Sequence, residues 1–395
     1  MRRRSWLRAA LAAWAARHGT ARAQTSAPPQ TSATSGNAPS APTPAAAPLI
    51  APRPLQLPRD HGAHPETRIE WWYATGWLAE AGAAPSAVAA LALQPAFGFQ
   101  LTFFRSRTGL AERSTGRFGA GQLLFAHAAL TDLAGQRLVH AERIARWNGD
   151  PAAPRAAAAL ADTRVHIGDW RFEREAGGYR AALADEGAAF GYRLELAPTQ
   201  PLLLQGQAGY SRKGPDAAQS SHYYSQPQLT VHGTLQHGGR TRQVRGGAWL
   251  DHEWSESVLP EGAVGWDWIG INLDDGSALT AFQLRRADGS ALWSGGSHRP
   301  RGGAVRDFDD REARFEAQSH WTSGATRARY PVRWRIDTPA GRYEVRALVD
   351  AQELDGRNST GTVYWEGLSA LFDAAGQRVG TGYLEMTGYA LPLRL

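Results

Sequence analysis

The stretch Gly98-Phe99-Gln100-Leu101-Thr102-Phe103-Phe104-Arg105 alternates apolar and polar side chains. A two-residue period carried by aromatic and β-branched residues is typical of a strand with one buried face. Similar runs recur at Gln122–Leu130, Val165–Glu173, Tyr192–Leu196, Gln228–Leu235, Ala278–Arg285, Val332–Ile336, Tyr343–Val349 and Gly382–Tyr389. Turn-forming residues separate many of them, at Gly238-Gly239, Asp274-Asp275-Gly276, Ala287-Asp288-Gly289 and Asp355-Gly356. No long stretch keeps a helical period, so we expect an all-β protein.

At 395 residues the chain is long enough for two barrels or sandwiches. A weak internal repeat supports two units, because each half has an aromatic–acidic strand, a turn or loop, and a strand that ends in arginine. The matching segments are Glu70–Leu78 with Phe99–Arg105, and Trp266–Leu273 with Leu279–Arg285. We expect the domain boundary near Gly238–Val244, which gives an N-terminal domain at 57–240 and a C-terminal domain at 241–395.

The N-terminal residues 1–23 are predicted to be an export signal. Arg3-Arg4-Ser5-Trp6-Leu7-Arg8 precedes the short apolar stretch Ala9–Ala16 and then Ala21-Arg22-Ala23, which resembles an A-x-A cleavage site. The paired arginines resemble a twin-arginine signal, so we expect a periplasmic or secreted protein. Residues 24–56 are mostly Ala, Pro, Ser, Thr and Gln and are expected to be a flexible linker, with the folded part beginning near Leu55.

Charge and cysteine content narrow the function classes. The formal net charge is +6, and the first 23 residues hold six arginines and no acidic residue, so the remainder sums to zero. Nucleic acid is therefore disfavoured as a partner. The absence of cysteine excludes disulfides and cysteine-based catalysis or metal binding. No later segment is long and apolar enough for a transmembrane helix, and no Gly-x-Ser-x-Gly elbow or His-Glu-x-x-His motif occurs.

Two tryptophan-rich patterns carry carboxylates among their rings: Glu70-Trp71-Trp72-Tyr73, and Trp249-Leu250-Asp251-His252-Glu253-Trp254 followed by Trp266-Asp267-Trp268. A carboxylate among indoles is costly to desolvate unless it is hydrogen-bonded or paired. The pattern therefore indicates either an aromatic ligand cavity with acid–base groups on its wall, or a core with structural ion pairs. For Glu70 we favour an ion pair with Arg68 or Arg105, and for Asp267 a structural pair as well.

These motifs together resemble the AttH family of secreted hydrolases, which is related to the bacterial carotenoid 1,2-hydratases. The resemblance covers nearly the whole chain from residue 57. It rests on Asp60-His61-Gly62 with His64, Glu70–Gly76, Phe99–Arg105, Ala126–Asp132, Gln205–Ser211, Tyr223–Pro227, Trp249–Trp254, Gly265–Gly270, Tyr364–Gly367 and Gly382–Tyr389. It implies two tandem lipocalin-like barrels and a pocket for an elongated apolar molecule.

Within Trp249–Trp254, a strand places His252 and Trp254 on one face and Asp251 and Glu253 on the other. His252-x-Trp254 resembles the His-x-Trp pair of the hydratases, and we expect these two side chains to face the cavity. The hydratases also use a tyrosine and an aspartate on the following strand, but here Leu279–Leu284 contains neither. The alternative is that His252 and Trp254 lock the two barrels together.

The candidate catalytic residues are therefore His252, Asp251, Glu253 and Trp254. The candidate ligand-binding residues are Glu70, Trp72, Tyr224, Trp266 and Trp268. Asp60, His61 and His64 offer metal-ligating atoms, but in an expected loop a structural or solvent-facing role is favoured, so no metal or cofactor is assigned.

We expect an exported protein that binds an extended hydrophobic small molecule, isoprenoid-like or lipid-like. Two alternatives remain open. Either it also performs hydratase-type or hydrolase-type acid–base chemistry, or it is a non-catalytic carrier or a structural envelope protein with filled barrels.

Overall fold

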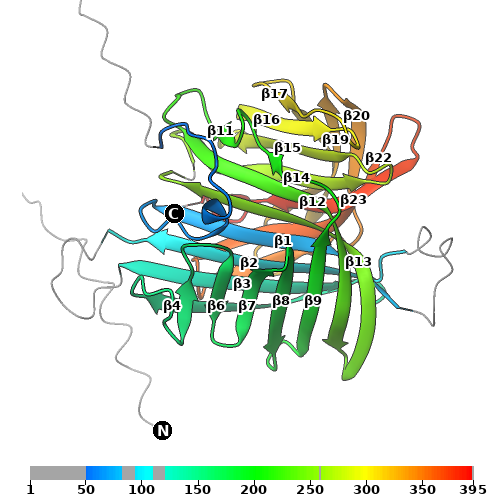
Figure 1. Ribbon diagram of the computed structural model, residues 1–395. Helices are drawn as coiled ribbons and strands as arrows, with labels where there is room; N and C mark the ends of the chain where they lie inside the picture. Colours follow the sequence, from blue (N-terminus) through cyan, green and yellow to red (C-terminus); the bar gives the residue numbers. More distant parts are fainter. Residues whose placement is uncertain (1–49, 82–93, 110–120, 258, 394–395) are drawn as a thin grey trace, which may run out of the picture. The chain divides into compact units, whose positions relative to one another are not determined.

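A computed structural model describes residues 50–81, 94–109, 121–257 and 259–393 (Figure 1). The expected signal at 1–23 and most of the expected linker at 24–56 lie outside these residues. The end of that linker packs on the fold, because Ile50 is buried and its carbonyl accepts a 3.1 Å hydrogen bond from the Tyr210 hydroxyl. The packed part of the chain thus includes residues before Leu55.

The all-β prediction is confirmed: the described residues form two antiparallel sheets, and their single helical element is the 3-10 turn η1 (Arg59–His61). The first sheet contains β1 (Ile69–Glu80), β2 (Phe97–Arg107), β3 (Gln122–Asp132), β4 (Arg137–Trp147), β5 (Ala156–Ala158), β6 (Arg164–Ile167), β7 (Trp170–Glu175), β8 (Gly178–Asp185), β9 (Phe190–Pro198), β10 (Leu203–Leu204), β11 (Tyr210–Arg212), β12 (Ser220–His237) and β13 (Arg240–Ser255). The second contains β14 (Gly265–Leu273), β15 (Ala278–Arg285), β16 (Ala291–Arg299), β17 (Arg306–Phe308), β18 (Arg314–Thr322), β19 (Arg329–Thr338), β20 (Gly341–Ala347), β21 (Glu353–Gly356), β22 (Thr362–Phe372) and β23 (Arg378–Met386).

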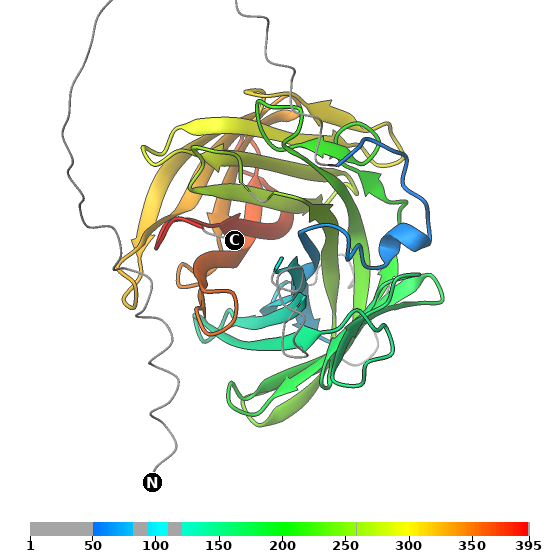
Figure 2. The ribbon, with the colours of Figure 1, turned by 90° about the vertical axis from the view of Figure 1, so that its left-hand side faces the viewer.

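The first sheet has the order β4-β3-β2-β1-β13-β12-β9-β8-β7-β6-β5, with β10 and β11 paired to β12. Its two edges approach each other, because β4 contacts β5 and β6, and Arg143 on β4 donates a 3.0 Å hydrogen bond to the carbonyl of Ile167 on β6. The sheet is therefore nearly closed into a barrel, and its curvature is visible in Figure 2. The long β12–β13 hairpin turns at Gly238-Gly239, where both residues have positive φ as a tight hairpin turn requires.

One expected strand is two strands. The run Val165–Glu173 is divided into β6 and β7, which pair with each other around a turn at Gly168-Asp169. Gly168 has a φ of 65°, a conformation that glycine adopts without a steric cost. The apolar residues alternate on each side of the turn, Val165 and Ile167 before it and Trp170 and Phe172 after it, but their phase shifts by one residue at Gly168-Asp169. The prediction of one strand overlooked this shift.

The second sheet has the order β17-β16-β15-β14-β23-β22-β20-β19-β18, with β21 paired to β22. The chain passes from the first sheet to the second between Ser255 and Gly265. The expected boundary near Gly238–Val244 instead falls on the β12–β13 hairpin, whose second strand pairs with β1 inside the first sheet.

Equivalent ion pairs occur in the two halves of the internal repeat. In the first half, Arg105 Nε lies 2.7 Å from Glu70 Oε2, and in the second, Arg285 Nε lies 2.9 Å from Asp267 Oδ2. All four side chains are buried, so each carboxylate is neutralised where the aromatic rings exclude water. The ion pairs expected for Glu70 and Asp267 are thus confirmed, with Arg105 as the partner of Glu70.

The two sheets pack on each other through one face of each. A hydrophobic cluster between them includes Tyr73 and Trp249 from the first sheet and Trp268, Phe282 and Tyr383 from the second. Side-chain hydrogen bonds also cross this interface, among them the bond from Gln100 Nε2 to Glu366 Oε2 at 2.8 Å. The region between the sheets is therefore an aromatic layer with polar groups inside it.

Candidate functional site

A cavity of about 370 Å³ lies within this aromatic layer. Strands of both sheets supply its wall, chiefly β1, β2, β12 and β13 from the first and β14, β15, β22 and β23 from the second. Its aromatic lining consists of Trp71, Tyr73, Phe104, Phe125, Tyr223, Trp266, Trp268, Phe282 and Tyr364. A cavity of this size and composition falls in the range of pockets that bind small molecules.

Strand β13 presents its carboxylates to this cavity. Asp251 and Glu253 line it, whereas His252 and Trp254 lie on the opposite face of β13, inside the first sheet. The predicted alternation is therefore correct, but the expectation that His252 and Trp254 face the apolar cavity is not met. Both faces of β13 are buried from Ala248 to Ser255, so residue polarity along this part of the strand did not distinguish the cavity side from the barrel side.

The Asp251 carboxyl group is fully enclosed by hydrogen-bond donors. Ser225 Oγ and Trp249 Nε1 lie 2.5 Å and 2.7 Å from Oδ1, and the Tyr223 hydroxyl lies 2.9 Å from Oδ2. Burial, together with the charge of Glu253, raises the pKa of Asp251 to about 7. Asp251 therefore holds a proton at a pH where an ordinary aspartate has lost it.

Glu253, two residues further along the same face, has a cationic partner. Lys213, the single lysine of the chain, places Nζ 3.1 Å from Glu253 Oε1. The same ammonium lies 4.4 Å and 4.7 Å from the ring centres of Tyr223 and Phe282. The two carboxyl groups therefore differ in their surroundings: Glu253 is paired with a cation, whereas Asp251 is surrounded by neutral hydrogen-bond donors.

A second carboxyl pair comes from the second sheet and was not singled out from the sequence. Glu366 on β22 and Glu385 on β23 are direct cross-strand partners, and both line the cavity. Burial raises the pKa of Glu385 to about 8, with Asp251 and Glu253 adding to the shift. Burial and the neighbouring Glu385 raise the pKa of Glu366 as well.

The proposed ligand-binding residues divide between the cavity and a buried cluster on the other face of the first sheet. Trp266 and Trp268 border the cavity, and Trp268 Nε1 donates a 3.3 Å hydrogen bond to the Tyr223 hydroxyl across the sheets. Glu70 also borders it, but its carboxyl group points into a buried polar cluster on the other face. Trp72 and Tyr224 lie in that cluster too, with exposed fractions of 2% and 0%.

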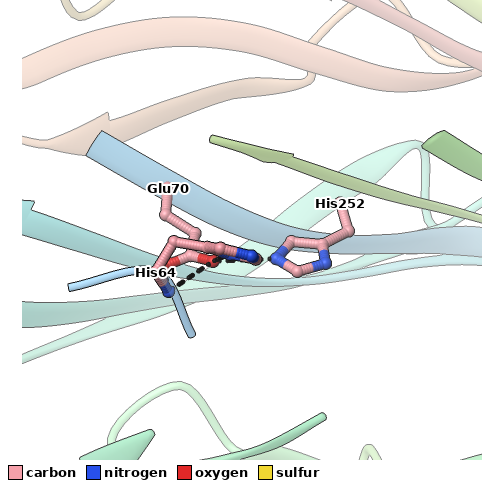
Figure 3. A group of neighbouring side chains, drawn as sticks. All are labelled: His64, Glu70 and His252. Atoms are coloured by element: carbon pink, nitrogen blue, oxygen red, sulfur yellow. Dashed lines mark hydrogen bonds and ion pairs between the residues drawn. The ribbon is translucent and has the colours of Figure 1, made fainter. Parts of the chain in front are cut away.

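The buried polar cluster is centred on Glu70 (Figure 3). Its Oε1 lies 2.7 Å from His64 Nδ1 and 3.0 Å from His252 Nε2, and its Oε2 accepts a 2.7 Å hydrogen bond from Arg105 Nε. Burial alone would raise the pKa of Glu70, but the hydrogen bonds from His252 and His64 hold it well below its usual value. Glu70 is therefore a carboxylate.

The two histidines differ in their surroundings. Burial lowers the pKa of His64, but hydrogen bonds to Asp60 and Glu70 outweigh it and give a net rise. Burial dominates for His252 and lowers its pKa. The Tyr224 hydroxyl joins His252 Nδ1 at 3.1 Å to His61 Nδ1 at 2.7 Å, which extends the hydrogen-bonded chain. The motif residues Asp60, His61 and His64 are thus buried members of this hydrogen-bonded chain, which agrees with the structural role, not the solvent-facing one, of the two that were favoured.

No helix among the described residues has the length and apolarity needed to cross a membrane.

Residues 48–389 match the family model described as AttH-like. No curated protein matches the chain.

Several solved structures resemble this chain, among them the following two. A Nitrosomonas europaea crystal structure assigned to AttH is 43% identical, covers 87% of this chain and 99% of its own, and superposes with a TM-score of 0.76. Kievitone hydratase from Nectria haematococca is 12% identical, covers 82% of this chain and 89% of its own, and superposes with a TM-score of 0.60, so the two share the lipocalin-like fold. The family match over most of the chain and the 43% identity agree. This chain belongs to the AttH-like family.

Proposed function

We propose that the protein binds an elongated apolar small molecule, isoprenoid-like or lipid-like, in the cavity between the two sheets. The observation that carries this proposal is an aromatic-walled cavity of about 370 Å³ whose polar lining includes the carboxyl groups of Asp251, Glu253, Glu366 and Glu385. Apolar walls supply affinity by removing ligand surface from water, and sparse polar groups orient the bound molecule.

We further propose that Asp251 and Glu253 act on the ligand as an acid and a base. Two carboxyl groups whose surroundings separate their charge states are the usual arrangement for acid–base catalysis near neutral pH. Asp251, with its pKa raised to about 7, is the proton donor, and Glu253 beside Lys213 is the proton acceptor.

For a carbon–carbon double bond the steps balance as a hydration. The Asp251 carboxyl group transfers its proton to one alkene carbon, and the cation on the other carbon is stabilised by the faces of neighbouring indoles such as Trp268. Water adds to that carbon while Glu253 removes one of its protons. Proton exchange between the carboxyl groups and water then restores the starting state. Kievitone hydratase, which shares this fold, is named as a hydratase, and this supports hydration as the class of reaction to test.

An alternative is a carrier without catalysis. Both oxygens of Asp251 already have protein partners in Ser225, Trp249 and Tyr223, which is also what a structural carboxyl group requires. Under this alternative the cavity binds the same class of ligand but leaves it unchanged.

Asp251→Asn separates the two functions, because the amide has the shape of the protonated acid. Its oxygen can accept the hydrogen bonds from Ser225 and Trp249, and its nitrogen donates where the protonated oxygen would. The mature protein is titrated with a panel of polyenes and acyl lipids by tryptophan fluorescence, and products are analysed by mass spectrometry. If Asp251 is the acid, the Asp251→Asn variant should bind the ligand with unchanged affinity but no longer add water to it. Asp132→Asn makes the same change outside the cavity and should alter neither the affinity nor the amount of product. If the wild type binds a ligand but forms no product, the carrier alternative is correct. If the wild type binds no ligand of the panel, both the enzyme and the carrier proposals are refuted.

We also propose that the protein is exported through a twin-arginine signal at Arg3-Arg4, which accords with a role at the cell envelope.

A further inference from the structure

The ring nitrogens of two histidines and one carboxylate oxygen converge at a point that the cavity chemistry does not use. His64 Nδ1, Glu70 Oε1 and His252 Nε2 all lie within 4.8 Å of one another, and Figure 3 shows the three side chains directed toward each other. We propose that His64, Glu70 and His252 bind one divalent transition-metal ion of the zinc class. This site lies on the opposite face of β1 and β13 from the aromatic cavity and does not depend on the proposed function.

The donor set matches this class of ion. Two imidazole nitrogens and one carboxylate oxygen are common ligands of Zn²⁺, with bonds of about 2.0–2.2 Å. Ligand atoms arranged tetrahedrally at that radius lie about 3.3 Å apart. The present separations from Glu70 Oε1 are 2.7 Å to His64 and 3.0 Å to His252, a few tenths of an ångström short of this spacing, and the two histidine nitrogens lie within 4.8 Å of each other. Binding of the ion would therefore require both imidazole rings to move slightly away from Glu70 and toward each other.

Each ligand is also held from its far side. His64 Nε2 lies 3.2 Å from Asp60 Oδ1, and His252 Nδ1 lies 3.1 Å from the Tyr224 hydroxyl. The second oxygen of Glu70 accepts hydrogen bonds from Arg105 Nε at 2.7 Å and from the backbone N–H of His64 at 2.9 Å. Outer partners of this kind fix the ring orientation and the carboxylate angle in metal sites.

The location indicates what the ion would do. His64 lies in the segment between η1 and β1, whereas Glu70 and His252 come from the paired strands β1 and β13. The Trp254 ring stacks on His64 with ring centres 3.8 Å apart, and Trp72 stacks on His252 at 4.9 Å. Since these indoles cover the group and all three ligands are buried, the ion would fasten the segment before β1 to the sheet and stabilise the fold.

The alternative is that the site binds no metal ion and that both histidines donate N–H hydrogen bonds to Glu70 Oε1. The two cases are separated by equilibrium dialysis of the untagged, chelator-treated full chain against ZnCl₂, followed by elemental analysis. We expect one zinc per chain and a rise of several degrees in the melting temperature. Glu70→Gln and His252→Gln should lose both effects. His232→Gln, which removes a solvent-exposed histidine 2.9 Å from Glu195, should retain both.

A measurement on the wild type alone covers the case in which the Glu70 and His252 variants fail to fold. Co²⁺ bound by this donor set should give visible absorption bands that saturate at one equivalent and disappear on addition of Zn²⁺. Wild-type protein that takes up no zinc in dialysis and shows no cobalt bands overturns the proposal. Equal zinc uptake by the wild type and a folded His252→Gln variant overturns it as well.

Discussion

Glu366 and Glu385 lie directly opposite each other on β22 and β23, and both face the cavity between the sheets. Directly opposed side chains of an antiparallel pair have Cβ atoms about 5 Å apart, so two ionised carboxylates there would repel each other strongly. Gln100 Nε2 donates to Glu366 and Trp266 Nε1 donates to Glu385, but no cation among the described residues is paired with either. Both carboxyl groups therefore keep a proton at pH values where an ordinary glutamate is ionised.

Glu385→Gln should flatten the pH dependence of stability. The folded-state pKa of Glu385 is raised to about 8, above its ordinary value of 4.5, so between these values the unfolded chain releases a proton that the folded chain keeps. The free energy of unfolding therefore falls as pH rises from about 4.5 to 8, by an amount on the order of a few kcal/mol. Urea unfolding at pH 5 and pH 8 should show a smaller fall in the variant. The exposed Glu175→Gln should leave the fall unchanged, and the same result for Glu385→Gln would refute the assignment.

The rate of water addition should decline as pH rises through about 7, because only the protonated form of Asp251 can donate its proton. The measurement is turnover of a polyene bound by the wild type, between pH 5 and pH 9. A rate that instead increases across this range would show that a base, and not Asp251, limits the reaction.

Leu284→Trp should block the cavity, because Leu284 is buried on its wall and the indole adds volume there. We expect at least a tenfold loss of affinity for an apolar ligand, measured by fluorescence titration. Leu160→Trp makes the same change at an exposed position and should bind as the wild type does. Equal affinity in both variants would place the ligand elsewhere.

Arg105→Leu should destabilise the protein by about 3–5 kcal/mol, because it leaves the buried Glu70 carboxylate without its cation. Arg180→Leu removes an exposed pair with Glu175 and should cost less than about 1 kcal/mol. Chemical denaturation of the two variants gives the comparison. A small effect of Arg105→Leu would mean that the histidines alone hold Glu70.

Replacing Arg3 and Arg4 by lysine should leave the precursor in the cytoplasm, because twin-arginine export depends on this pair. Cell fractionation and immunoblotting of the double variant measure the outcome. Normal export of the variant would rule out the twin-arginine route.

The alternation along β1 and β13 was predictable because a strand has a fixed two-residue period. It correctly grouped Asp251 with Glu253 and His252 with Trp254. The alternation did not predict which of the two groups faces the cavity, because β13 is buried on both faces from Ala248 to Ser255 and both faces carry polar residues. The cavity side depends on how the second sheet covers the first, which no local pattern contains.

The remaining parts of the site depend on distant pairings. Glu366 and Glu385 were present in motifs of the family resemblance, but their opposition follows from the register of β22 with β23. Likewise, His64 and His252 meet only because β1 pairs with β13. Their spacing along the chain carries no metal-binding signature, so three-dimensional structure was needed to bring them together.

Native mass spectrometry of the mature protein purified from its own cell envelope, with organic extraction of anything bound, would show whether the cavity holds an apolar ligand. We expect one co-purifying isoprenoid-like or lipid-like molecule per chain, absent from Leu284→Trp. Wild-type protein that carries no such molecule and binds none from a panel of polyenes and lipids would contradict the proposed ligand binding.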